Sequence, residues 1–558
     1  MLLGIDVGGT FTDAVVVAAG KVIVQVKTPT THGQLLAGIL TALDKAMIGI
    51  DSGEIERVAL STTIVTNTLV EGKTDPVGLC LLPGPGMDLS GMIPAKSYRL
   101  AGSIDHRGRE VVEPDRLAVH DACRDFTDCD VFAVSGKFSV RNPKQELQVA
   151  RWIRETADPN YISLGSAVSG TLNFWRRTNS AYYNAAVWRQ FGVFAADIET
   201  ALAQRDVTAP VYVLKADGGT MPLAAAKEQP VEAIFTGPAA SVLGIMAMHD
   251  NHLPAISLDI GGTTTDIALW QEGVPLFAAR GANISGYPTA VRAFWLKSVG
   301  LGGDSFVRRE NGKLKIGPMR RGPAMAMGGD QPTVSDAMIV AGKASFGDET
   351  RAYEAMTQVA ASDQTPQETA RMVMEAAAEI IWQSVEAMLD EQVAAPVYRV
   401  EDVVHSNRFL PRWVIGVGGA AGGLAPLVAK KYQVPCVVPE GAMVANAVGA
   451  AVARPTIDIT LRADTAQGYF TIAELGLRQR LTKQHFGLAD AGELASQYLS
   501  ERAKQAAMSV SEVETLQAEE FNLVRGFSTA GKIITCRRQI KPGVLMNISG
   551  FSQKGAVL

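Results

Sequence analysis

The chain has 558 residues, of which 47% are hydrophobic and 20% are charged, and its formal net charge is -5. This balance is typical of a globular protein, and the length favours several domains over one core. The negative net charge and the lack of a dense Lys/Arg run argue against a nucleic-acid-binding surface. No stretch approaches the roughly 18 apolar residues of a membrane span, and the first residues do not resemble a signal peptide, so we expect a cytoplasmic protein.

The chain opens with an apolar run, a glycine-containing turn and a second apolar run over residues 1–17, and this pattern returns at residues 255–270. Both copies contain the motif D-[VI]-G-G-T-x-T-D, at residues 6–13 and 259–266. Apolar runs on both sides of a glycine turn predict a β-hairpin. The copies lie about 250 residues apart, which is too far for a solenoid repeat and indicates two related halves.

The remaining elements fit an α/β chain. Residues 211–214 and 414–417 are short apolar runs that predict buried strands. Residues 366–394 have apolar positions spaced by three and four, which predicts a long amphipathic helix. Residues 466–510 have a helical pattern, and residues 520–547 a strand pattern. We therefore expect three regions, with boundaries at residues 1–250, 251–455 and 456–558.

The twin hairpins predict a phosphate-binding site. Adjacent glycines leave no Cβ near a ligand, so successive backbone N–H groups can face one anion. Threonine hydroxyls in the same turns add donors. The residues expected to contact phosphate are Gly8, Gly9, Thr10, Thr12, Gly261, Gly262, Thr263 and Thr265.

Four aspartates belong to these motifs and are the candidate catalytic residues. Asp6 and Asp259 end the leading strands, where their carboxylates would lie beside the phosphates. A carboxylate repels phosphate unless a divalent cation lies between them, so both are candidate Mg²⁺ or Mg²⁺-water ligands. Asp13 and Asp266 follow the turns, and each could orient water or substrate or simply cap its hairpin.

A third glycine-rich loop follows the strand at 414–417, with Gly418, Gly419 and Gly422 as candidate nucleotide contacts. Taken alone, its G-x-G-x-x-A pattern also resembles a dinucleotide-binding fingerprint. The hairpins favour the other interpretation, a loop beneath adenosine, because a dinucleotide site needs no phosphate hairpins elsewhere.

Other catalytic patterns are missing from the sequence. The segment Glu71-Gly72-Lys73-Thr74 ends like a P-loop, but Asn67 stands where the first glycine is required. The seven histidines show no zinc-site spacing, and the five cysteines predict reduced thiols. The small residues at 440–453 predict a tightly packed helix, whose stretch from Met443 to Ala453 is a candidate hinge.

With these motifs in place, the chain resembles the hydantoinase A / 5-oxoprolinase family of the actin-like ATPase superfamily, over most of residues 1–455. Besides the first hairpin motif, the segments that carry the resemblance are Ser61 to Leu69, Ile104 to Arg109, Asp217-Gly218-Gly219, Thr236-Gly237-Pro238-Ala239, Gly302-Gly303-Asp304 and Pro332 to Ala337. Three segments depart from the family pattern: Gly322 to Gly328 lacks its cysteine, Leu424 to Leu427 lacks its histidine, and Arg177-Thr178-Asn179 fits loosely.

The resemblance implies two ribonuclease-H-like halves with an ATP cleft between them, followed by a small α+β region. It also implies ATP and Mg²⁺ as cofactors, a cyclic amide such as a hydantoin or 5-oxoproline as substrate, and a separate hydantoinase B-like subunit as partner. Two alternatives stay open: an ATP-using subunit of an acetone-carboxylase-like enzyme, and an ATP-driven activator or switch protein.

Overall fold

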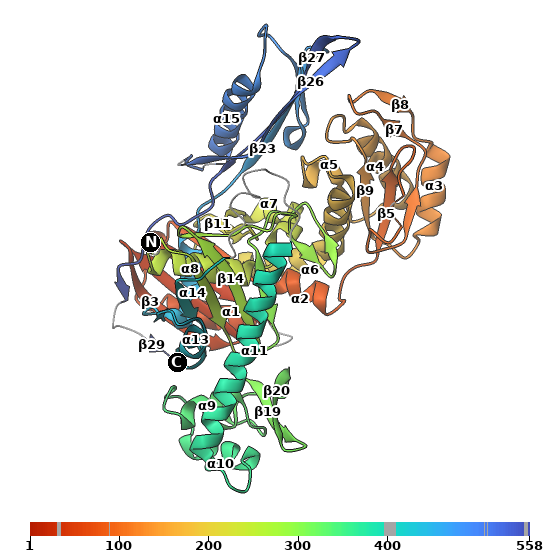
Figure 1. Ribbon diagram of the computed structural model, residues 1–558. Coiled ribbons are helices and arrows are strands. Elements are labelled where there is room, and N and C mark those ends of the chain that lie inside the picture. Colours follow the sequence, from red (N-terminus) through yellow and green to blue (C-terminus); the bar gives the residue numbers. More distant parts are fainter. Residues whose placement is uncertain are drawn as a thin grey trace.

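The computed structural model describes residues 1–30, 35–88, 90–250, 252–394, 409–506, 508–510, 512–551 and 556–557 (Figure 1). Two mixed sheets, each opening with a glycine-turn hairpin, form the centre of the molecule. A four-stranded domain inserted in the first half, a helical lobe in the second half and a C-terminal α+β region surround them. No helix in the described residues is both long and apolar enough to span a membrane.

The first sheet has the order β12-β11-β4-β1-β2-β3-β28, with β29 also paired to β3. Its strands are β1 (Leu2–Val7), β2 (Phe11–Ala18), β3 (Lys21–Pro29), β4 (Arg57–Thr62), β11 (Val211–Leu214), β12 (Thr220–Pro222), β28 (Gly550–Phe551) and β29 (Ala556–Val557). Strands β1, β4 and β11 are parallel, whereas β2 is antiparallel to β1 and places Asp13 opposite Asp6. The parallel strands therefore bring the loops after Val7 and Thr62 to one edge, where a ligand can meet both.

Helices cover this sheet on both sides. They include α1 (Leu35–Ala46), α2 (Ile64–Val70), α6 (Phe174–Ala203), α7 (Leu223–Glu228) and α8 (Thr236–Met248). The apolar side chains of β1, including Leu3 and Ile5, pack in one buried cluster with those of α1 and α6. This packing fixes the strand end from which Asp6 projects.

The second sheet has the order β15-β14-β13-β21-β22, with β18 also paired to β14. Its strands are β13 (Ala255–Ile260), β14 (Thr265–Gln271), β15 (Val274–Pro275), β18 (Leu296–Val299), β21 (Trp413–Val417) and β22 (Cys436–Val437). The hairpin of β13 and β14 places Asp259 opposite Asp266, the same register as in the first sheet. The repeated sequence motif therefore forms the same hairpin in both sheets.

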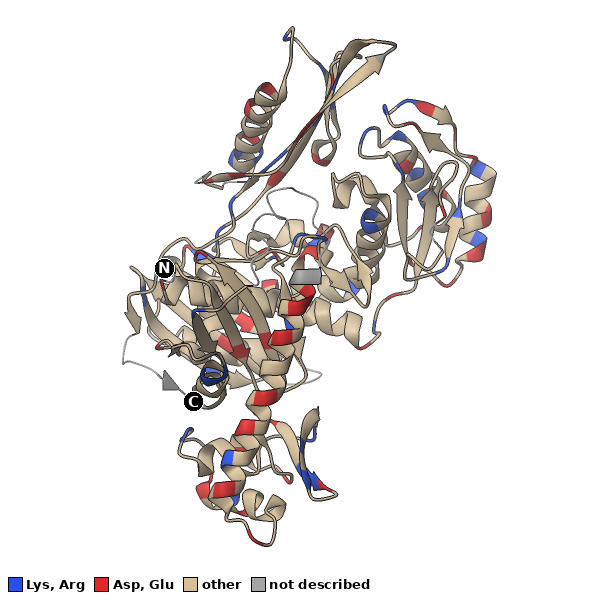
Figure 2. Ribbon diagram, viewed as in Figure 1, with Lys and Arg blue, Asp and Glu red and all other residues tan. Residues whose placement is uncertain are grey.

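The long helix expected at 366–394 is α11 (Pro366–Ala394), with acidic residues spaced along it in Figure 2. It packs with α9 (Val334–Val340), α10 (Glu349–Val359) and the hairpin of β19 (Ser305–Glu310) and β20 (Lys313–Arg320). The glycine loop after β21 leads into α13 (Ala421–Tyr432). Buried side chains of α11 and α13 belong to the apolar cluster of the second sheet.

Helices α8 and α14 (Ala445–Val452) pack at very close range. A Cβ on Gly449 would lie 1.9 Å from the Ala240 carbonyl oxygen, and one on Gly244 would lie 2.2 Å from that of Ala445. Only glycine fits such a contact. Helix α14 also packs against β1, so this small-residue helix joins the second half to the sheet of the first.

The domain inserted in the first half contains a sheet of order β10-β9-β5-β6. Its strands are β5 (Val77–Leu82), β6 (Ser97–Arg99), β9 (Val131–Gly136) and β10 (Tyr161–Leu164), and its helices are α3 (Arg116–Asp125), α4 (Lys144–Ala157) and α5 (Gly165–Val168). The buried Glu146 carboxylate of α4 accepts hydrogen bonds from the backbone N–H groups of Gly136 and Ser166. These bonds fix the start of α4 against the sheet.

The C-terminal region contains a sheet of order β25-β24-β23-β27-β26, with α15 (Leu488–Gln505) packed against it. Its strands are β23 (Asp458–Asp464), β24 (Tyr469–Ile472), β25 (Leu477–Arg480), β26 (Val513–Arg525) and β27 (Ser528–Ile540). The helical pattern expected over 466–510 was therefore wrong before residue 488. There, apolar residues of β24 such as Phe470 and Ile472 pack across the sheet onto α15. The division of the chain at residues 250 and 455 stays a proposal.

Candidate functional site

A cavity of about 480 Å³ lies between the two hairpins and the glycine loop. The residues that line it are far apart in the sequence, and many of them belong to the sequence motifs described above. The predicted residues that line it are Asp6, Gly8, Gly9, Thr10, Asp13, Asp259, Gly261, Gly262, Thr263, Asp266, Gly418 and Gly419. Both halves thus contribute backbone N–H groups and carboxylates to one space.

Three of the predicted contact residues do not line this cavity. The buried Thr12 hydroxyl lies 3.1 Å from that of Thr30, and the buried Thr265 hydroxyl donates to the Leu301 carbonyl at 2.7 Å. Gly422 is exposed in the first turn of α13. We attribute a local structural role to the two threonines, because their hydroxyls are engaged inside the fold.

Asp6 is buried, and its Oδ1 atom has no hydrogen-bond partner among the described residues. Burial, and after it the nearby charge of Asp13, raises the pKa of Asp6 to about 7. An unpaired carboxylate oxygen in a polar cavity is costly unless a ligand, cation or water meets it. Asp6 therefore fits a role as a ligand of Mg²⁺ or of a Mg²⁺-bound water.

Asp13, opposite Asp6, is paired with a lysine that lies outside the sequence motifs. The Lys27 ammonium donates to both Asp13 carboxylate oxygens, at 2.7 and 2.9 Å. Burial raises the pKa of Asp13, and Lys27 partly opposes this effect. Lys27 also lies 4.9 Å from the Phe11 ring centroid and lines the cavity, where it places positive charge near a phosphate.

Asp259 has the position in the second hairpin that Asp6 has in the first. Burial raises the pKa of Asp259, whereas its hydrogen bond with the Asn446 side chain, at the start of α14, lowers it. A Cβ on Gly418 would lie 2.6 Å from Asp259 Oδ1, and Gly418 has a φ of +90°, so both the contact and the backbone require glycine. The glycine loop and the second hairpin are therefore built against each other.

Asp266 lies opposite Asp259 in the second hairpin. Burial, followed by the charge of Asp259, raises the pKa of Asp266 to about 7, and a hydrogen bond with Ser298 opposes the rise. The described residues give Asp266 no cationic partner equivalent to Lys27. The two hairpins thus share a backbone but differ in the charge around their second aspartate.

Arg320, at the end of β20, joins the two halves across the cavity. Its guanidinium donates to the Thr10 hydroxyl at 3.2 Å and forms an ion pair with Asp304 at 3.0 Å. Arg320 therefore offers a second cation near the first hairpin, supplied from the opposite half. Sequence reasoning missed it because an isolated arginine in a β-hairpin carries no motif.

The other missed lining residues come from segments that were recognised but given no role. Thr63 and Asn67 follow β4, and Gly237 and Pro238 open α8, on the side of the cavity near the first hairpin. The Thr236 hydroxyl donates to the Thr62 carbonyl and accepts from the Thr62 N–H, which fixes these two segments together. These residues lie in two of the segments that carry the family resemblance, and that position is the sequence signal that could have identified them.

The residues around the cavity suit ATP and Mg²⁺. Glycine turns from both halves can present N–H groups to phosphates, and two strand-end carboxylates can meet a cation between them. Within the described ranges, no group of three or more His, Cys, Asp or Glu side chains gathers to hold a metal ion. Mg²⁺ commonly takes one or two carboxylates together with phosphate oxygens and waters, so these residues fit it.

Comparison with known proteins gives independent evidence on the family of the chain. The hydantoinase/oxoprolinase family model matches residues 177–459, and the model of its N-terminal region matches residues 2–157. The caprolactamase α subunit of Pseudomonas jessenii is 28% identical over 386 residues, which cover 62% of this chain and 55% of the relative. The acetophenone carboxylase γ subunit of Aromatoleum aromaticum is 25% identical over 475 residues, which cover 75% and 63%.

Two solved structures share the fold over nearly the whole chain. Nucleotide-free acetone carboxylase superposes with a TM-score of 0.72 at 17% identity, and the match covers 98% of this chain and 88% of that one. The ATP-dependent caprolactamase of Pseudomonas jessenii superposes with a TM-score of 0.67 at 20% identity, and the match covers 97% and 87%.

The fold is of the actin-like class, with two related α/β halves on either side of one cavity. Within that class, the chain belongs to the hydantoinase/oxoprolinase family. The fold and the family expected from the motifs are therefore confirmed. The chain spans only 55% and 63% of the two curated relatives described above, so the activity of the whole protein is a matter for proposal.

Proposed function

We propose that this chain is the ATP-using component of an enzyme that opens a cyclic amide of the hydantoin or 5-oxoproline type. One observation carries the proposal: the hairpins of both halves converge on a cavity in which the buried Asp6 Oδ1 has no partner. This is the arrangement that a metal–nucleotide complex needs. The family match and the caprolactamase relative support a lactam-like substrate.

The proposed chemistry makes a poor electrophile reactive. The amide carbonyl oxygen attacks the γ-phosphorus of ATP, the bond to ADP breaks, and the carbonyl carbon gains a phosphate leaving group. Water then attacks that carbon, the ring C–N bond breaks as the nitrogen takes a proton, and a second water releases phosphate from the resulting acyl phosphate. The protein contributes positioning and charge neutralisation, as in other phosphoryl transfers.

The residues of this chain divide that work between them. Glycine-turn N–H groups and the Thr10 hydroxyl hold the phosphates, while Lys27 and Arg320 offset their negative charge. Asp6 and Asp259 hold Mg²⁺ or its waters; when bound, Mg²⁺ neutralises charge on the transferring phosphate. The proposed place for the amide is the edge formed by Thr63, Asn67 and Gly237, because it borders the first hairpin.

Nucleotide binding should also draw the two halves together. Each half supplies only part of the cavity, so ATP binds the closed arrangement better than an open one, and this difference in affinity drives closure. Helix α14, which packs closely on α8 and reaches the first sheet, stays the proposed hinge. Solution scattering with and without a non-hydrolysable ATP analogue tests this, and we expect a smaller radius of gyration with the ligand.

A second candidate function is that of an ATP-using subunit of an acetone-carboxylase-like enzyme. The 25% identity to the acetophenone carboxylase γ subunit, over 75% of this chain, favours it. In that reaction a ketone or bicarbonate would take the phosphoryl group in place of the amide. Turnover that depends on bicarbonate would select this candidate.

Both candidates include a separate second subunit. The relatives named above are subunits of larger enzymes, and we propose a hydantoinase B-like partner for this chain. Purification from the native source, followed by identification of co-eluting proteins, tests this. Full ring-opening activity by the isolated monomer would contradict it.

The experiment that best separates the functions is a screen of substrates by ADP release, with and without co-purified partners. Hydantoin, 5-oxoproline and caprolactam form one set, and ketones with and without bicarbonate form the other. We expect a cyclic amide to stimulate ADP release and to be opened in parallel. Stimulation only by a ketone with bicarbonate would overturn the ring-opening proposal.

A further inference from the structure

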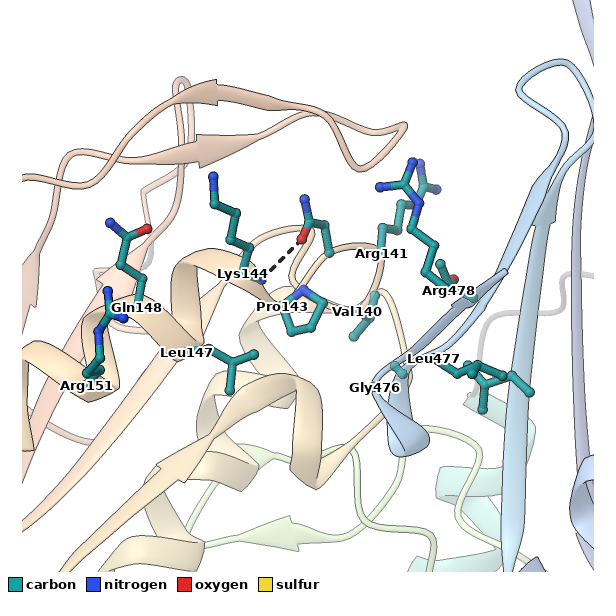
Figure 3. Close-up of a pocket in the computed structure, with 14 residues that line it drawn as sticks. Val140, Arg141, Pro143, Lys144, Leu147, Gln148, Arg151, Gly476, Leu477 and Arg478 are labelled. Atoms are coloured by element: carbon teal, nitrogen blue, oxygen red, sulfur yellow. Dashed lines mark hydrogen bonds between the residues drawn. The ribbon is translucent and has the colours of Figure 1, made fainter. Parts of the chain in front are cut away.

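A second cavity, of about 510 Å³, lies between helix α4 and the strands β24 and β25 (Figure 3). One wall consists of residues 140–151 of the inserted domain, and the other of residues 471–478 of the C-terminal region. None of its lining residues belongs to the cavity between the hairpins. We refer to it as the α4 cleft.

The α4 cleft is lined by cations and by no carboxylate. Its four charged residues are Arg141, Lys144, Arg151 and Arg478, accompanied by the amides of Asn142 and Gln148. Clefts lined by one sign of charge concentrate ions of the opposite sign. This local excess contrasts with the net charge of -5 of the whole chain.

Most of these cations form no ion pair within the described part of the chain. Lys144 bonds to Glu110 at 2.5 Å, but the described residues give Arg141, Arg151 and Arg478 no ion pair. The Nε atom of Arg141 is buried without a hydrogen-bond partner. Arg478 lies with its guanidinium 4.1 Å from the Tyr469 ring centroid, which leaves its N–H groups free for a ligand.

The carboxylate of Asp464, whose charge acts on Arg141, already has other partners. Asp464 accepts two hydrogen bonds from Arg107, at 3.0 and 3.1 Å, and a third from the Gln467 N–H. Arg462, beside it, has no ion pair among the described residues; burial and then the charge of Arg141 lower the pKa of Arg462 to about 9. An anion beside Arg141 would offset this repulsion between partly desolvated cations.

The shape of the α4 cleft suits a small molecule. In Figure 3, Arg141 and Arg478 project at one end of the cleft. Gln148 and Arg151, which belong to α4, lie at its other end. Leu147 and Leu477 form apolar parts of the two walls. Lys144 and Arg151 are two helical turns apart, about 10 Å along the axis. Ligand sites commonly have volumes of this size, with apolar walls and a few placed polar groups.

We propose that the α4 cleft is a binding site for a small organic anion, whose carboxylate or phosphate oxygens bond to Arg141 and Arg478 while its apolar part contacts Leu147 and Leu477. Two walls from different regions form it, so the anion would also hold the inserted domain against the C-terminal region. This site is separate from the nucleotide cavity and does not depend on the function proposed for it.

Titration calorimetry in Mg²⁺-free buffer tests the site, with citrate as the carboxylate probe and inorganic pyrophosphate as the phosphate probe. Both are compared with sodium chloride of equal ionic strength. We expect at least one probe to bind. The Arg151→Gln/Arg478→Gln variant should bind it at least about tenfold more weakly, because the charged hydrogen bonds of Arg478 and the longer-range attraction of Arg151 are lost. Both arginines are exposed, so the variant should fold.

A matched control removes the same charge elsewhere. The Arg371→Gln/Arg412→Gln variant changes two exposed arginines outside the α4 cleft and should bind the probe like the unaltered protein. The Arg478→Lys variant, which keeps the charge, should retain most of the affinity. Equal binding by all variants would place the probe elsewhere, for example at the hairpins, and would overturn the proposal, as would no binding of either probe at 10 mM (roughly tenfold above a millimolar dissociation constant).

Discussion

The two glycine-turn hairpins have the same backbone but different surroundings. In both, the first aspartate of the motif lies directly opposite the second, Asp6 opposite Asp13 and Asp259 opposite Asp266. Asp13 holds an ion pair with Lys27, whereas Asp266 has a hydrogen bond with Ser298 and no ion pair among the described residues. A repeated motif thus repeats the geometry for phosphate without repeating the charges around it.

Hydrogen bonds from other segments fix both turns. In the first, the Thr30 N–H and hydroxyl groups donate to the carbonyls of Thr10 and Gly8, at 2.8 and 2.9 Å. In the second, the Gly303 and Asp304 N–H groups donate to the carbonyls of Gly261 and Gly262, at 2.9 and 2.6 Å. A hydrogen bond with Asn446 lowers the pKa of Asp259, and one with Ser61 lowers that of Asp6, but Asp6 Oδ1 has no partner among the described residues. From this unpaired oxygen we propose a division of labour, in which Asp6 of the first hairpin is the main carboxylate at the metal and the second hairpin mainly positions the nucleotide.

The sharpest test of this division compares Asp6→Asn with Asp259→Asn. We expect Asp6→Asn to lower Mg²⁺-dependent ATP turnover by roughly a hundredfold or more, because a carboxylate at the metal is lost beside the transferring phosphate. Asp259→Asn should lower turnover less and weaken nucleotide binding more. Steady-state kinetics and nucleotide titration measure both effects.

Circular dichroism serves as the control for folding in both variants. Full turnover by a folded Asp6→Asn protein would remove Asp6 from the metal site. Equal losses of turnover and of nucleotide affinity in the two variants would instead show that the hairpins act alike, and the proposed division would be wrong.

A second test concerns the bridge between the halves. Arg320→Gln removes the cation that the second half places beside Thr10. We expect roughly a tenfold or larger loss in kcat, because Arg320 offsets phosphate charge from a fixed position. The neighbouring Arg321→Gln is the matched control, since Arg321 contacts the Phe306 ring and does not line the cavity. Equal kinetics for both variants would assign Arg320 a purely structural role.

The hairpins could be predicted from sequence because their chemistry is local. Gly8 and Gly9 and their counterparts adjoin the strands that position them, so periodicity and turn residues suffice. Lys27 and Arg320 could not be predicted, because strand pairing and domain packing bring them to the site from other segments. The same limit explains the wrong helix before residue 488, where strand pairing within the C-terminal sheet decides the structure.

A third test asks whether the glycine loop contributes as much to nucleotide binding as the second hairpin it supports. A Cβ on Gly419 would meet no atom within 4 Å, so Gly419→Val should fold while its side chain enters the cavity. We expect ATP to bind about tenfold more weakly, a loss of roughly 1.4 kcal/mol. Gly422→Val is the control, since Gly422 has equally open space but does not line the cavity. An unchanged dissociation constant for Gly419→Val would reject the placement of adenosine beside this loop.

The smallest expected effect is a pH-dependent difference in thermal stability between variants of Asp13 and Asp266. Burial raises the pKa of Asp266 to about 7, far above its ordinary value of 3.8, so the folded protein keeps a proton that the unfolded chain releases. The contribution of Asp266 to the free energy of unfolding is therefore full below about pH 4 and is lost as the pH rises towards 7. Asp266→Asn should match the unaltered protein at pH 4.5 and exceed its apparent Tm at pH 8 by about 1–3 °C. Asp13→Asn should raise the apparent Tm at pH 8 by less, because Lys27 partly opposes the effect of burial on the pKa of Asp13. Thermal unfolding without added metal or nucleotide measures both, and equal shifts at pH 8 would show that Lys27 makes no difference between the two hairpins.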